Sequence, residues 1–224
     1  MTRISEPKPI LKPVEVRAAT WPVLSRVALP VFDPLPQDFS AVIESRRSRR
    51  CLKTARFRDI ISVVSFALRP RYENVSGLAR QYRSPTMSAG ALRSVEALIV
   101  DWRGALRVFR FCLSGHTLEK LEVINKQAAG KFVGHFEKVL PAAGATAIVL
   151  VGDVARISSF YENPESLLFR DAGALLQSLA VSSTAFDIGF CPMGILGGEL
   201  LDALGMKVEE VTPVGVAAIG AISD

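Results

Sequence analysis

The basic segment Arg46-Arg47-Ser48-Arg49-Arg50 is the first candidate for a ligand-binding site. Between Glu44 and Arg58 there are seven arginines and lysines and one acidic residue, whereas the whole chain has a net charge of only +5. Arg46 and Arg50 would repel each other on one helical face. A bound phosphate would replace that repulsion with charge-assisted hydrogen bonds, and Ser48 would add a hydroxyl donor. A solvated basic helix and a nonspecific nucleic-acid patch are the alternatives.

Two segments of small residues are the next candidates, because a planar ring can approach the backbone closely where side chains are small. Ser88-Ala89-Gly90-Ala91 precedes an expected short helix, whose first amides would donate hydrogen bonds to ring carbonyls. Cys191-Pro192-Met193-Gly194 invites the same interpretation. An ordinary tight turn is the alternative for both segments.

The sequence lacks the patterns that are typical of several other kinds of binding site. Gly194, Gly197 and Gly198 do not follow the strand–GxGxxG–helix order of a dinucleotide site, and no Walker motif is present. His116 and His135 have no metal-ligand spacing, so no metal is expected. No nucleic-acid-binding signature accompanies the arginines, so nucleic acid is not an expected partner. Cysteines without a CxxC pair, a start without a signal-like apolar stretch and the lack of a membrane-spanning run favour a cytoplasmic protein with no membrane partner.

The elements that must position these residues begin with a proline-rich stretch. Residues 1–36 contain seven prolines and are expected to form an extended arm on the surface of this subunit or of a partner. Residues 37–224 are expected to form a single domain. Asp38 is typical of an N-cap, and the helix that it begins is expected to run into the basic segment. A buried helix is expected at Ile60–Leu68, where apolar residues cover most of the circumference.

The rest of the chain contains both expected strands and expected helices. The strands are Val95–Asp101 and Leu106–Leu113, which form a hairpin, then Thr146–Gly152 and Val214–Ile219. The helices are a brief one within Ser88–Ser94, one from Thr117 to about Ala129, a short one at Val154–Tyr161, a long one at Asp171–Phe186 and a last one at Glu199–Leu204. This mixture, with no internal repeat, predicts the α+β class.

Five groups of residues occur in an order that resembles a known family. They are Leu35-Pro36 with Asp38 and Arg46–Arg50, then Ser88–Leu92 with Glu96, then Ala172-Gly173 with Gln177, then Gly189-Phe190-Cys191 to Gly194, and finally Ile219-Gly220. Together they resemble the SagB-type (thiazoline/oxazoline) dehydrogenases of the flavin-dependent nitroreductase superfamily, over residues 35–220. Met87 stands where that family has proline.

The resemblance implies a nitroreductase-like α+β fold, in which helices flank a central mixed or antiparallel sheet. It also implies a homodimer with FMN at the subunit interface and the helix Asp171–Phe186 in the dimer core. The implied cofactor contacts are Arg46, Arg47, Ser48 and Arg50 for the phosphate and ribityl chain, Ser88, Ala89 and Gly90 along the isoalloxazine of one subunit, and Met193 and Gly194 for its other contacts.

The implied activity is hydride transfer between flavin and an organic substrate, either a small molecule or a peptide. Azoline dehydrogenases resemble one another in a Lys-Tyr pair before the long helix. This chain has Phe160-Tyr161, so Tyr161 is the candidate acid or base and the lysine is missing. Residues 217–224 contain no Lys or Arg, so the basic segment alone would hold the phosphate. An NAD(P)H-dependent nitro or quinone reductase and a non-catalytic flavin-binding subunit of a biosynthetic complex are the alternatives.

Overall fold

The computed structural model describes residues 5–13, 15–76, 79–141 and 144–223. The helices are α1 (Phe39–Ser45), α2 (Phe57–Leu68), the 3₁₀ turn η1 (Ala89–Ala91), α3 (Lys126–Val139), α4 (Val154–Ser158), α5 (Glu165–Ala185) and α6 (Gly198–Leu204). The strands are β1 (Lys8–Pro9), β2 (Val23–Ala28), β3 (Leu52–Lys53), β4 (Tyr72–Ser76), β5 (Ala79–Arg83), β6 (Val95–Asp101), β7 (Arg107–Cys112), β8 (Thr117–Leu121), β9 (Thr146–Asp153), β10 (Tyr161–Glu162), β11 (Gly189–Met193) and β12 (Val211–Ile222).

One antiparallel sheet forms the centre of the molecule. Its strands lie in the order β11-β12-β9-β6-β7-β8-β2, and β3 pairs with the end of β12. Every residue of β6 and β9 is buried, because these central strands are covered on both faces. The prediction of an α+β fold with a central sheet flanked by helices is confirmed.

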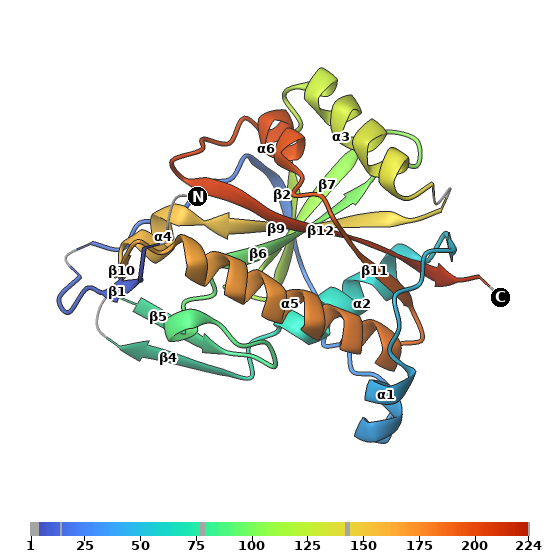
Figure 1. The fold of residues 1–224 in the computed structure, drawn as a ribbon, viewed down its shortest axis with the longest axis horizontal. Helices are drawn as coiled ribbons and strands as arrows, with labels where there is room; N and C mark the ends of the chain where they lie inside the picture. The colour runs from blue at the N-terminus through green and yellow to red at the C-terminus, as the bar shows by residue number, and fades with distance from the viewer. Residues whose placement is uncertain (1–4, 14, 77–78, 142–143, 224) are drawn as a thin grey trace.

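Helices cover the two faces of the sheet and make two hydrophobic cores (Figure 1). α2 and α5 pack on one face, where Ile60 and Leu179 are fully buried. α3 and α6 pack on the other face through Phe132 and Leu200. In the described part of the chain, no helix combines the length and the apolar character needed to cross a membrane.

Helix α1 ends before the basic segment, so the expectation that Arg46 and Arg50 share a helical face is wrong. Asp38 caps the helix as expected and accepts a hydrogen bond from the Ala41 amide at 3.0 Å. At the other end, the Ser45 hydroxyl donates to the Ala41 carbonyl at 2.7 Å, and Arg46 turns out of the helix with ψ 120°. A helix continued through the arginines would place like charges one turn apart. The basic segment is therefore a loop between α1 and β3.

The expected helix from Thr117 to Ala129 is also wrong, because its first half is strand β8. Leu118 and Leu121 enter the two different cores. Residues three apart lie on opposite faces of a strand but on the same face of a helix, so this burial requires the extended form. Helix α3 begins only after Asn125, whose side chain accepts hydrogen bonds from the first amides of that helix.

The described part of the proline-rich stretch lies on this subunit's own surface. β2 pairs with β8 and forms one edge of the main sheet, and Trp21 just before it is buried in the core beneath α3 and α6. β1 pairs with β10. The domain boundary between residues 36 and 37 stays a prediction.

Two glycines let the chain after the basic segment lie close against the sheet. β3 pairs with Ala221 and Ile222 at the end of β12. A Cβ on Gly220 would lie 2.6 Å from the carbonyl oxygen of Lys53, and a Cβ on Gly189 would collide with a Leu52 methyl group. Any larger residue at either position would push β3 away from the sheet.

Candidate functional site

The turn Ser88–Gly90 is held in place by Asp171 of α5, a helix that begins at Glu165 rather than at the expected Asp171. Both carboxylate oxygens of Asp171 lie 3.0 Å from the Ala89 amide, which donates to them. Burial raises the pKa of Asp171, and hydrogen bonds from Ala89 and Ser88 only partly offset this effect. Burial also lowers the pKa of the nearby Arg93, which is attracted electrostatically to Asp171. The turn is thus tied to the start of α5 by a buried charge.

The turn does not offer the amides of a helix start to a ring, contrary to expectation. The Ala89 amide is taken by Asp171, the Ala91 amide donates to the Ser88 carbonyl at 3.0 Å, and the Arg93 amide donates to the Ser88 hydroxyl at 2.9 Å. The expected helix within Ser88–Ser94 is reduced to η1, because Gly90, Ala91 and Arg93 have φ values of 56°, 55° and 55°. What remains for a ligand is the partly exposed surface of the small residues Ser88, Ala89 and Gly90.

Tyr161 lies against this turn. Its hydroxyl oxygen would be 3.2 Å from a Cβ placed on Gly90, so the missing side chain at Gly90 makes room for the phenol. Tyr161 is half-buried in β10, whereas Phe160 beside it lines a separate cavity. The structure therefore brings together Tyr161 and the turn Ser88–Gly90, and the catalytic role of Tyr161 stays a prediction.

The basic segment lies at the other end of α5. Arg47 and Arg49 line a groove of about 280 Å³ together with Ala180 and Thr184 of that helix. The Arg49 amide donates to the carbonyl of Phe190 in β11 at 2.9 Å, which fixes the loop to the sheet. Among the described residues, no carboxylate forms an ion pair with the four guanidinium groups of the basic segment. The segment has the positive charge and the donors that a phosphate requires.

Met193 and Gly194 follow on β11 from the point where the basic segment is attached. Met193 is half-buried against the core beneath α3 and α6, and Gly194 is exposed with open space around its Cα. The turn Ser88–Gly90 contacts α5 at Asp171, whereas the basic segment lies beside Thr184 of the same helix. From Asp171 to Thr184, this helix is about 20 Å long. One chain therefore holds the predicted contacts as two separate groups.

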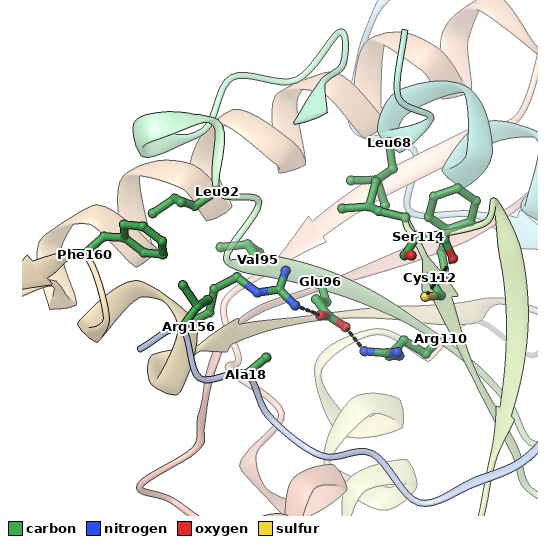
Figure 2. A pocket seen from close by; sticks show the side chains of 13 residues that line it. Ala18, Leu68, Leu92, Val95, Glu96, Arg110, Cys112, Ser114, Arg156 and Phe160 are labelled. Atoms are coloured by element: carbon green, nitrogen blue, oxygen red, sulfur yellow. Dashed lines mark hydrogen bonds and ion pairs between the residues drawn. The ribbon is translucent and has the colours of Figure 1, made fainter. Parts of the chain in front are cut away.

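The sequence analysis missed a row of ion pairs whose carboxylates are buried, which we call the ion-pair row. Glu119, fully buried, accepts hydrogen bonds from Arg26 at 2.7 Å and from Arg110 at 2.8 Å. Arg110 also donates to Glu96 at 2.7 Å, and Arg156 lies on the other side of Glu96 (Figure 2). Arg156 also forms an ion pair with Asp153. The row consists of Arg26, Glu119, Arg110, Glu96, Arg156 and Asp153.

Burial and neighbouring charges oppose each other along this row. Burial lowers the pKa of Arg110, but the attraction of Glu96 and Glu119 outweighs it and the pKa is raised overall. Burial raises the pKa of Asp153, and the attraction of Arg156 and the hydrogen bonds from the Arg156 and Ala19 amides do not reverse the effect. In the sequence, only the alternating charges on neighbouring strands could have indicated the ion-pair row. Such charges are equally typical of an exposed sheet face, so they did not predict it.

Within the described ranges, no three His, Cys, Asp or Glu side chains are grouped closely enough to hold a metal ion. No protein-family model matches this sequence, and no curated protein matches it.

Solved structures match the fold. A protein described as a nitroreductase from Ralstonia eutropha JMP134 aligns with a TM-score of 0.65 at 14% identity, over 98% of this chain and 100% of that chain. A protein from Desulfovibrio desulfuricans, described as a nitroreductase in complex with FMN, aligns with a TM-score of 0.52 at 14% identity, over 84% and 88%. A chain of the Escherichia coli microcin synthetase McbBCD complex, with truncated pro-MccB17 bound, aligns with a TM-score of 0.53 at 14% identity, over 88% and 78%. This protein has the nitroreductase fold.

Proposed function

We propose that this protein is an FMN-dependent oxidoreductase of the SagB-type dehydrogenase class, which acts as a homodimer with FMN between the two copies. The observation that carries the proposal is the division of the predicted contacts on a nitroreductase fold. The unpaired basic segment lies at one end of α5, and the turn Ser88–Gly90 with Tyr161 lies at the other. A partner packed with its α5 antiparallel would bring the basic segment of one copy to the turn of the other.

The exposed face of α5 supports this arrangement. Phe169 is 51% exposed, Gly173 has open space where its Cβ would be, and Gln177 is exposed one turn further on. Phe39 of α1, which projects from the body of the molecule, is 74% exposed (Figure 1). Large apolar side chains exposed beside a flat helix face are typical of an interface.

Each group of residues has a distinct role in the proposed site. Bound FMN would supply the hydride-accepting chemistry that no side chain provides. Arg46, Arg47, Ser48 and Arg50 would hold its phosphate, and Asp171 would keep the turn Ser88–Gly90 flat against the ring. Met193 and Gly194 would make the remaining contacts. Tyr161, beside Gly90, would hold or accept the substrate proton.

The substrate would be a small molecule or a peptide, and NAD(P)H would be the donor if the flavin is reduced first. The likeness in fold to a chain of the microcin synthetase complex supports the SagB-type assignment. The missing lysine beside Tyr161 favours chemistry in which the phenol acts without a basic partner.

The proposal is tested by the visible absorption spectrum of the purified protein and by identification of any chromophore released on denaturation. A yellow protein that releases about one FMN per subunit is expected, in line with the cofactor contacts supplied by each copy. Bleaching of the flavin absorbance by NAD(P)H or by an organic substrate would then distinguish a catalytically active enzyme from a non-catalytic flavin-binding subunit. A colourless protein that takes up no added FMN would overturn the proposal.

The shared site is tested by Gly173→Glu. The new side chain has open space within one copy, and replacing a helical glycine favours the helix, so the monomer keeps its stability. Between two copies it would place two carboxylates in the interface. We expect loss of the dimer in light scattering together with loss of FMN. Gly130→Glu on the exposed side of α3, where a Cβ also meets nothing, is the matched control and leaves both unchanged.

A further inference from the structure

A cavity of about 390 Å³ opens where strands β6 and β7 part. The ladder between these strands ends at the pair Leu98 and Arg110. β6 nevertheless extends to Val95 along β9, and β7 extends to Cys112 along β8. The strands diverge beyond their last pair, and the cavity lies in the gap (Figure 2). Its apolar walls come from Leu68, Leu92 and Phe160.

One edge of the ion-pair row faces this cavity with unused hydrogen-bonding groups. Glu96 Oε2 accepts from Arg110 at 2.7 Å, whereas Glu96 Oε1 and Arg156 Nη2 are 3.6 Å apart, which is too far for a hydrogen bond. No other residue in the described part of the chain forms a hydrogen bond with either atom. Glu96 and Arg156 both line the cavity, so a bound ligand can reach these two atoms.

The charge of the row limits what can bind there. Its three arginines balance its three carboxylates, so a charged ligand would leave one charge uncompensated in a half-buried site. A neutral group that has an acceptor next to a donor would satisfy both atoms. A carboxamide has this arrangement: its oxygen accepts from Arg156 Nη2, and its N–H donates to Glu96 Oε1.

We propose that the cavity between β6 and β7 binds the carboxamide group of a small amphipathic molecule, whose apolar part lies against Leu68, Leu92 and Phe160. The volume lies within the range of about 300–1,000 Å³ typical of small-ligand pockets. This site is distinct from the proposed flavin contacts but adjoins them in sequence, because Leu92 follows the turn Ser88–Gly90 and Phe160 precedes Tyr161. A ligand held here would lie beside the turn that Asp171 fixes.

The test uses three probes with the same apolar part, measured by calorimetry on the full chain with and without added FMN. They are 3-phenylpropanamide, 3-phenylpropanoate and 3-phenylpropylamine. We expect the amide to bind about tenfold more tightly than the anion and the cation, since each charged probe leaves one polar group unmatched. Tighter binding of either charged probe, equal binding of all three or no binding at all would overturn the proposal. Because the binding is measured in both states, its outcome is separate from that of the flavin proposal.

Two substitutions locate the site. Arg156→Lys keeps the charge balance but removes the planar donor group, and it is expected to remove the preference for the amide while far-ultraviolet circular dichroism stays unchanged. Ala18→Phe fills the cavity from its exposed rim and is expected to weaken the amide about tenfold or more, since the bulky ring occupies the apolar space. Ala105→Phe, in the exposed turn between β6 and β7, is the matched control. Amide binding that survives both Arg156→Lys and Ala18→Phe would place the ligand elsewhere.

Discussion

The basic segment and the ion-pair row use the same side chain in opposite circumstances. In the basic segment the four arginines lie within five residues of sequence, are partly or fully exposed, and are unpaired with any described carboxylate. In the ion-pair row Arg26, Arg110 and Arg156 come from distant parts of the chain and alternate with acids. Positive charge left without a partner is available for a ligand, whereas paired charge is committed to the fold except at the one edge that faces a cavity.

The largest expected effect comes from breaking the ion-pair row at its centre. Arg110→Met keeps most of the volume but removes the arginine that the buried Glu96 and Glu119 share, so each acid keeps only its other partner in the row. We expect the free energy of unfolding to fall by about 3–5 kcal/mol in urea titrations. Arg47→Met in the basic segment is the control and should change it by less than about 0.5 kcal/mol. Equal losses in the two variants would remove the distinction between the regions.

The next effect concerns the ligand rather than the fold. The double variant Arg47→Ala/Arg50→Ala is expected to weaken FMN binding by about a hundredfold or more, because each hydrogen bond to a charged group contributes about 1.5–3 kcal/mol and two of them are lost. The free energy of unfolding without FMN should change little. Lys131→Ala/Lys138→Ala on exposed positions of α3 removes the same charge and tests for a general electrostatic effect. Similar losses of FMN affinity in both double variants would argue against direct phosphate contacts.

A smaller effect appears in the pH dependence of stability. Burial raises the pKa of Asp153 in the folded protein, so the folded state binds this proton more tightly than the unfolded state. The contribution of Asp153 to the free energy of unfolding therefore falls as pH rises from about 4, the ordinary aspartate pKa, through the raised value. Asp153→Asn should remove this decline in urea titrations between about pH 4 and pH 7.

The pKa of Asp101 is shifted in the opposite direction to that of Asp153, which provides a comparison. Burial opposes ionisation there too, but hydrogen bonds from Arg103 and Arg107 prevail and lower its pKa. Its stabilising contribution is lost as pH falls below the ordinary aspartate range, so Asp101→Asn should flatten the acid side of the profile. The same slope in both variants would contradict the opposite directions in which the folded protein shifts the pKa values of Asp101 and Asp153.

The smallest effect is expected at the ion pair Arg56–Asp59, which lies just beyond the basic segment. Its nitrogen and oxygen are 2.9 Å apart, but the Arg56 side chain is 87% exposed. Asp59→Asn should change the free energy of unfolding by less than about 1 kcal/mol, because solvent screens such pairs. A loss as large as that of Arg110→Met would show that exposure does not separate the two kinds of pair.

Contiguous features of the sequence predicted most of the fold. The strands at Val95–Asp101 and Thr146–Gly152 and the long helix through Leu175 and Leu179 followed from runs and periodicities of apolar residues. The errors arose where distant partners decide the structure. Thr117–Leu121 is a strand because its side chains pack into two different cores and into the ion-pair row. These distant contacts cannot be deduced from the local sequence pattern.

The candidate site was predictable in its parts but not in their arrangement. The basic segment and Ser88–Gly90 are visible in the sequence as short motifs. Tyr161 lies against Gly90, in agreement with the prediction that Tyr161 and Ser88–Gly90 belong to one site. That the two motifs lie at opposite ends of α5 depends on the sheet order, which no motif specifies. Asp171 was seen only as the start of a helix, since a buried acceptor and an exposed helix cap look alike in sequence.

The pairing of β3 with the end of β12 has a consequence for the order in which the protein matures. The basic segment leaves the ribosome early, but the residues that hold the adjoining β3 in place, Ala221 and Ile222, are synthesised far later. Until they arrive, of the described hydrogen bonds only that from the Arg49 amide to Phe190 is available to hold the basic segment against the sheet. The basic segment would thus reach its final position only after β12 has been synthesised and paired with β3, and uptake of the proposed FMN would follow that step.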